Sequence, residues 1–177
     1  MAMGFGPIWQ LGYVVSDLDA ALEHWLAAGV GPWYVFDPLP VDRFCYRGGP
    51  SIVPDVVVAL AYSGATQVEL IHQRDQAPTL YRDFLATNGE GLQHLGFRPG
   101  DYDGALTSAV ANGWEVAHEG AAAGTRFVYL DAGSHAGSVT ELVDLDPRST
   151  SLFAHMASEA ATWDGLTRPI RPLSKTR

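Results

Sequence analysis

A repeated motif constrains the fold of this chain more than any other feature of its sequence. Gln10-Leu11-Gly12 recurs 84 residues later as His94-Leu95-Gly96. Residues 10–29 and 94–113 align without a gap, and 8 of the 20 aligned pairs are identical. Two copies at this distance predict a duplicated supersecondary unit, because a solenoid needs at least three repeats.

Each copy starts with the pattern of a strand followed by a helix. Residues 8–15 and 91–98 have the composition and alternation of strands. The helices predicted after them begin at Asp17 and Asp101 and end before a glycine. Further strand patterns follow each helix. We therefore predict an α+β fold of paired βαβββ modules, which form a cupped mixed sheet with the helices outside.

The repeat also predicts how the chain is divided. We expect one domain over residues 7–146, followed by a C-terminal helix and tail over residues 147–177. Within the domain, the modules span residues 7–75 and 90–146, and a linker helix spans residues 77–88.

Two segments do not belong to the repeated pattern. Residues 31–54 contain several Pro and Gly residues and predict one short strand, Trp33–Phe36, followed by a long loop. A helix near residues 149–163 carries Leu152, Phe153, Met156 and Trp163, an apolar set too large for a free tail. We expect this helix to pack on its own domain or across a dimer interface, with a homodimer favoured, and the residues after it to be mobile.

Composition excludes several classes of partner. The net charge of −9 argues against binding to nucleic acid or to an anionic membrane surface. No run of 18 apolar residues predicts a membrane span, and the first residues lack the pattern of a signal peptide. The single cysteine, Cys45, suits a reducing compartment. We expect a cytoplasmic protein with a small-molecule substrate, and ten arginines against one lysine suggest a bacterial source.

Strand alternation places four polar side chains on one face of the predicted sheet. In the first strand of each module, Leu11 and Leu95 face the helix, so Gln10 and His94 face the other way. In the last strands, Glu69 and Glu141 also face away from the helices. If the two modules curl together, these four side chains meet.

A buried cluster of two carboxylates, an imidazole and an amide is costly unless a cation neutralises it. We therefore predict that Gln10, Glu69, His94 and Glu141 bind one divalent metal ion, with Zn, Co, Ni or Mn as candidates for this mixed nitrogen and oxygen set. The alternative is that the glutamates face solvent on a half-exposed sheet.

The chain resembles the vicinal oxygen chelate superfamily, the glyoxalase and bleomycin-resistance fold of paired βαβββ modules. The resemblance covers residues 7–146 and implies one metal ligand from the first and last strand of each module, at the four positions given above. Methylmalonyl-CoA epimerases have sequences similar to this chain at Val68–His72, Asn88–His94 and Thr140–Leu142. This chain has Gln10 where epimerases usually have His, and the middle of strand 55–60 has no acid, where bacterial epimerases carry a second Glu.

The resemblance implies a metal-dependent isomerase, epimerase or lyase that enolises a carbonyl or thioester substrate. Glu141 is then the catalytic base as well as a ligand, and no substrate-binding residue is assigned. The ligand set Gln, Glu, His, Glu also resembles glyoxalase I, a lactoylglutathione lyase. A metal-free binding or resistance protein is a further alternative, whereas a ring-cleaving dioxygenase would need two His and one Glu.

Overall fold

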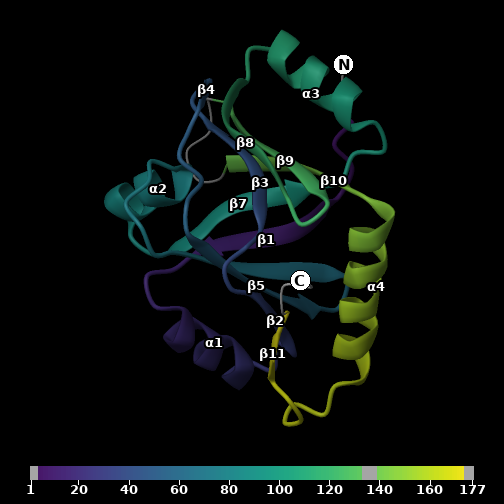
Figure 1. The fold of residues 1–177 in the computed structure, drawn as a ribbon. Coiled ribbons are helices and arrows are strands. Elements are labelled where there is room, and N and C mark those ends of the chain that lie inside the picture. Colours follow the sequence, from purple (N-terminus) through teal and green to yellow (C-terminus); the bar gives the residue numbers. More distant parts are fainter. Residues whose placement is uncertain (1–3, 133–138, 174–177) are drawn as a thin grey trace.

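The computed structural model describes residues 4–132 and 139–173, and the strands in these residues form one strongly curled sheet (Figure 1). The strands are β1 (Ile8–Val14), β2 (Trp33–Phe36), β3 (Val41–Tyr46), β4 (Gly49–Pro50), β5 (Val56–Ser63), β6 (Thr66–Gln73), β7 (Gly91–Phe97), β8 (Glu115–Ala122), β9 (Thr125–Asp131), β10 (Val139–Leu145) and β11 (Ile170–Pro172). The helices are α1 (Leu18–Ala27), α2 (Leu80–Asn88), α3 (Tyr102–Ala111) and α4 (Pro147–Thr162).

The sheet is built from two equivalent halves. Its strand order is β11-β2-β5-β6-β1-β7-β10-β9-β8-β3-β4. In each half the first strand pairs in parallel with the last, β1 with β6 and β7 with β10. The halves join where β1 pairs antiparallel with β7. The predicted α+β fold, a cupped mixed sheet from paired modules, is confirmed.

The two equivalent helices begin and pack as the repeat predicts. Asp17 accepts a hydrogen bond from the Ala20 amide at the start of α1, and Asp101 does the same for Gly104 at the start of α3. Figure 1 shows α1 and α3 on the outer side of the curl. The linker helix α2 begins at Leu80, later than predicted, because Thr79 caps it by accepting from the Arg82 amide.

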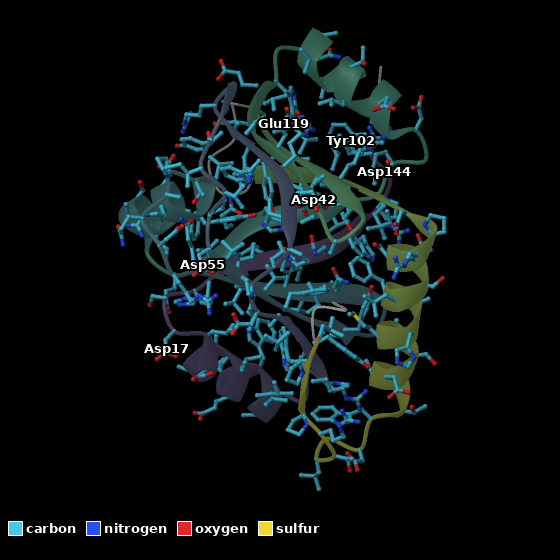
Figure 2. The ribbon with its side chains drawn as sticks, in the orientation of Figure 1. Asp17, Asp42, Asp55, Tyr102, Glu119 and Asp144 are labelled. Atoms are coloured by element: carbon cyan, nitrogen blue, oxygen red, sulfur yellow. The ribbon has the colours of Figure 1, made fainter. Side chains whose placement is uncertain are left out.

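A surface cluster attaches α3 to the sheet. The guanidinium of Arg126, on β9, lies 4.6 Å from the centre of the Tyr102 ring. It also contacts Asp144 on β10 at 2.7 Å and Asp103 on α3 at 3.2 Å. Figure 2 labels Tyr102 and Asp144, which come from the helix and from the strand respectively. The cluster therefore connects one helix to two strands of the second module.

The prediction of a loop after β2 is wrong, because residues 41–50 form β3 and β4. β3 pairs with β8, at the opposite end of the strand order from β2. Only residues 37–40, here called the bridging segment, connect β2 to β3. Its Leu39 amide donates to Val56 at 2.8 Å, and its Pro40 carbonyl accepts from Ala123 at 3.1 Å. The two ends of the sheet are therefore held close together, and the sheet curls into a half-barrel.

Helix α4 packs on its own chain. Met156 is buried in the main core, and Leu152 and Phe153 pack against the same core. This is one of the two outcomes expected for the helix, and the homodimer stays a prediction that light scattering can test. In the described part of the chain, no helix is long and apolar enough to cross a membrane.

The residues after α4 were predicted to be mobile, and this prediction is wrong for residues 170–172. They form β11, which pairs in parallel with the edge strand β2. Arg171 donates to the Tyr34 hydroxyl and to Glu159, each at 2.8 Å. The end of the described chain is therefore fastened to both β2 and α4.

Candidate metal centre

The structure brings the four predicted side chains together at the centre of the curled sheet. They come from the four neighbouring strands β6, β1, β7 and β10. Nε2 of His94 lies 3.2 Å from Oε2 of Glu69, 3.4 Å from Oε2 of Glu141 and 3.4 Å from Oε1 of Gln10. All four side chains are buried or nearly so: His94 is fully buried, and the side chain of Glu69 is 13% exposed. We call these four residues the central cluster.

The repeated glycines make this convergence possible. Gly12 lies opposite His94 in the β1–β7 pair, and Gly96 lies opposite Gln10. A Cβ atom at Gly12 would lie 1.8 Å from the His94 ring, and one at Gly96 would lie 2.7 Å from Oε1 of Gln10. Each module therefore leaves a space at its glycine for the polar side chain of the other module.

Two glutamines orient the cluster, and the sequence analysis missed both. Oε1 of Gln93 lies 2.8 Å from Nδ1 of His94. An amide oxygen only accepts, so Nδ1 carries a proton, and Nε2 is the nitrogen that faces the cluster. Nε2 of Gln10 donates to Oε1 of Gln67 at 2.7 Å, which turns Oε1 of Gln10 toward His94.

Alternation could have found only one of these two glutamines. Gln67 precedes Glu69 by two residues on β6, so the two side chains share a face. Gln93 immediately precedes His94, and alternation predicts the opposite face. The β1–β7 register shifts here, since Gly12 pairs with His94 and Tyr13 pairs with Leu92. A bulge of this kind re-aims side chains, and a single sequence carries no signal for it.

The negative charges of Glu69 and Glu141 in the central cluster are not fully neutralised by the side chains around them. Oε2 of Glu69 and Oε2 of Glu141 are buried and accept no hydrogen bond. Burial raises the pKa of Glu141 to about 7; His94 and a hydrogen bond from Tyr129 oppose this shift, and Glu69 adds to it. Burial lowers the pKa of His94, but Glu141 and Glu69 outweigh burial, so the pKa is raised. The cluster therefore retains protons unless another cation replaces them.

The spacing of the cluster fits a metal ion. Two donors bound at about 2.1 Å lie about 3.0 Å apart at a right angle and about 3.4 Å apart at a tetrahedral angle. The three separations from Nε2 of His94, 3.2 to 3.4 Å, fall in this interval or at its end. Ligand atoms of Glu69, His94 and Glu141 all lie within 4.8 Å of one another. A divalent ion would also satisfy both unpartnered carboxylate oxygens.

A pocket opens over the central cluster. Gln10, Glu69 and Glu141 line it, whereas His94 lies beneath them. Much of its wall is apolar, with Trp9, Phe36, Leu39, Phe127, Leu152 and Phe153 among the lining residues. The cluster can therefore contact a bound small molecule.

Two tyrosine hydroxyls beside Glu141 were not predicted from the sequence. Tyr129 lies opposite Glu141 in the β9–β10 pair and hydrogen-bonds to it. Its hydroxyl oxygen lies 3.1 Å from that of Tyr81, on α2, and both residues line the pocket. Burial raises the pKa of each tyrosine well above its usual value, so both hydroxyls remain protonated. The middle of β5 contributes Val58 and Leu60 to the pocket and no acid.

The chain was compared with protein families and with known proteins. Residues 9–129 match the family model described as the glyoxalase/bleomycin resistance protein/dioxygenase superfamily. No curated protein sequence matches the chain.

Several solved structures have a similar fold. The methylmalonyl-CoA epimerase of Mycobacterium tuberculosis is 21% identical, with 80% of this chain and 89% of that chain covered and a TM-score of 0.58. That of Streptomyces coelicolor, in complex with 2-nitronate-propionyl-CoA, is 22% identical, with 78% and 96% covered and a TM-score of 0.57. A methylmalonyl-CoA epimerase in complex with methylmalonyl-CoA and NH4+ is 24% identical, with 79% and 94% covered and a TM-score of 0.56. At these identities the likeness concerns the fold.

Proposed function

Since this chain belongs to the glyoxalase/bleomycin resistance protein/dioxygenase superfamily, we propose that it is a divalent-metal-dependent enzyme that enolises a carbonyl or thioester substrate. The central cluster supports this proposal most directly, because two buried carboxylate oxygens at the floor of a pocket accept no hydrogen bond. Epimerisation beside a thioester carbonyl is the first reaction to test, since structurally similar proteins include methylmalonyl-CoA epimerases.

In the proposed mechanism, Gln10, Glu69, His94 and Glu141 hold the ion. When bound, the ion supplies Lewis-acid polarisation of a carbonyl oxygen. Glu141 lines the pocket, and we assign it the removal of the proton alpha to that carbonyl. Tyr129 hydrogen-bonds to Glu141 and holds its carboxylate in position.

A glyoxalase I-type lyase is the second candidate. The apolar side chains that β5 presents to the pocket favour it. An epimerase must deliver a proton to the face opposite the one from which it was removed. Val58 and Leu60 of β5 offer no acid or base for this step. A glyoxalase-type isomerisation can return the proton from the same base, so Glu141 alone is sufficient.

The experiment combines metal analysis with proton exchange. We expect the purified, untagged chain to bind about one equivalent of Zn, Co, Ni or Mn. The loaded protein is then assayed for exchange of the alpha proton of methylmalonyl-CoA in D2O, and for conversion of the hemithioacetal of methylglyoxal and glutathione. Exchange of the thioester supports the epimerase, and turnover of the hemithioacetal supports the lyase.

Variants separate binding from catalysis. Glu141→Gln keeps an oxygen donor and should retain the metal, while the reaction rate falls by a factor of about 100 or more because the base is lost. His94→Ala should lose the metal as well. Glu119→Gln, which removes a charge that pairs with Arg43 at the surface, is the matched control. A chain that takes up none of these metals, and whose stability is unchanged by Glu69→Ala, would instead be a metal-free binding protein.

A further inference from the structure

A substrate that bears a carboxylate would need a positively charged partner in the pocket above the central cluster. Among the described residues that line it, none is Lys, Arg or His. Glu69 and Glu141 would already neutralise a bound divalent ion, so a further carboxylate would leave one uncompensated negative charge against an apolar wall. Burying such a charge is costly.

Three of the hydroxyl groups in the wall already have hydrogen-bond partners. The hydroxyl of Ser149 donates to the Ala123 carbonyl at 2.9 Å. The hydroxyls of Tyr81 and Tyr129 lie 3.1 Å apart, and Tyr129 also bonds to Glu141. Arg98 lies over the ring of Trp9, 5.1 Å from its centre, and is not among the lining residues.

The bridging segment and α4 add to the apolar wall of the pocket. Leu39 comes from the bridging segment, and Leu152 and Phe153 come from α4. The Phe153 ring stacks on Trp9 with centroids 5.9 Å apart and an interplanar angle of 28°. These additions cover the central cluster with aromatic and aliphatic side chains.

From this lining we infer that the substrate carries an uncharged, apolar group, such as a phenyl or branched alkyl group, next to the carbonyl that reacts, and not a free carboxylate. This inference rests on the proposed function and specifies the class of its substrate. A malonyl-type acyl group is thereby a poor substrate, whereas aryl or alkyl ketones and acyl groups without a carboxylate are good ones.

The first test uses hydroxamates, which present two adjacent oxygens to a metal. Binding of acetohydroxamate, butyrohydroxamate, benzohydroxamate and succinomonohydroxamate to the metal-loaded chain is measured by calorimetry. Benzohydroxamate should bind about tenfold or more tightly than acetohydroxamate because the phenyl ring is buried. Succinomonohydroxamate should bind at least about tenfold more weakly than butyrohydroxamate, which has the same chain length without the charge. Equal or tighter binding of the carboxylate-bearing compound would overturn the inference.

A charge placed in the wall should reverse this preference. Leu152→Arg supplies a cation to the pocket and should favour succinomonohydroxamate over butyrohydroxamate. Leu166→Arg, at a side chain that is 82% exposed and outside the pocket, is the matched control and should keep the wild-type order. If Leu152→Arg does not fold, Leu39→Arg serves the same purpose from the bridging segment. An unchanged order in a folded pocket variant would contradict the assignment of this wall to the substrate.

A metal-independent probe separates this inference from the proposed function. N-phenyl-1-naphthylamine, a neutral dye that fluoresces in apolar pockets, is added to the chelator-treated chain. We expect its fluorescence to rise with the wild type and with Leu166→Arg, and to fall several-fold with the folded pocket variant. Failure of acetohydroxamate to bind, with dye binding intact, would contradict the metal-dependent function and leave the apolar pocket standing. Acetohydroxamate binding without dye binding would contradict the apolar pocket alone.

Discussion

Gly12 and Gly96 show how one residue type lets two modules share a site. Each glycine lies beneath a polar side chain of the opposite module, His94 over Gly12 and Gln10 over Gly96. The parallel neighbours of these glycines are Glu69 and Glu141, respectively. The repeated motif of the sequence therefore provides space at its glycine as well as a polar side chain two residues earlier.

Adding one methyl group at Gly12 should disrupt the central cluster. Gly12→Ala should destabilise the fold by about 1–3 kcal/mol and weaken metal binding, because a Cβ would overlap the buried His94 ring. Gly96→Ala should cost less, since its nearest contacts, Oε1 and Cβ of Gln10 at 2.7 and 2.8 Å, are longer than the 1.8 Å contact at Gly12. Urea unfolding and metal titration measure both effects. Gly100→Ala is the control, with no atom within 4 Å of its Cβ. A Gly12→Ala variant as stable as this control would contradict the packing argument.

The sequence predicted those residues of the candidate site that follow the regular alternation of side chains along a strand. Gln10, Glu69, His94 and Glu141 were found because they occupy equivalent places in the two modules. Gln93 was missed because a register shift in the β1–β7 pair brings it to His94. Tyr81 was missed for another reason: it reaches the pocket from the linker helix, where no repeat constrains it.

Among the secondary-structure elements, α4 combines a structural role with a place in the pocket wall. Its Met156 is buried in the core within the curl of the sheet, while Leu152 and Phe153 line the pocket. Met156→Ala should lower the free energy of unfolding by about 2–5 kcal/mol, because a buried side chain is replaced by a cavity. Ser158→Ala, on an exposed position of the same helix, should change it by less than about 0.5 kcal/mol. Chemical denaturation compares the two, and similar values would show that α4 is only loosely attached.

Helices and strands differed in how well the sequence predicted them. The helices α1 and α3 follow from their Asp caps and terminal glycines, which are local signals. β3 was missed because its partner is β8, far along the chain, and a short segment between Pro and Gly residues carries no trace of that pairing. β11 was missed for the same reason, since its partner is the edge strand β2.

The stability of the whole molecule should depend on pH in opposite ways with and without metal. In the metal-free chain, Glu141 binds a proton up to about pH 7 when folded, but only below its ordinary pKa of 4.5 when unfolded. Protonation therefore favours the folded state, and stability should fall as the pH rises from 4.5 to about 7. His94 acts in the same direction, because its raised pKa gives stability that is lost as the pH rises through that value. Metal binding requires both groups to lose their protons, so metal-induced stabilisation should increase over the same interval.

Thermal unfolding between pH 5 and pH 8, with chelator and with added Zn or Co, measures both trends. Carboxylates with lowered pKa values, such as Asp75 and Asp146, contribute stability that is lost only below their usual range and do not mask the effect. Glu141→Gln should flatten the metal-free profile, and Glu119→Gln should not. A metal-free midpoint that rises steadily from pH 5 to pH 7.5 would contradict the assigned protonation of the cluster.

The arrangement of β6, β1, β7 and β10 also constrains the order of folding. The donors of the central cluster lie between residues 10 and 141, so they meet only after distant segments have paired. Closing such long loops is the slow part of folding for sheets of this kind. An ion that needs all four side chains finds no complete binding site in a chain with only one folded module. It therefore stabilises the finished structure against unfolding and does not nucleate its formation.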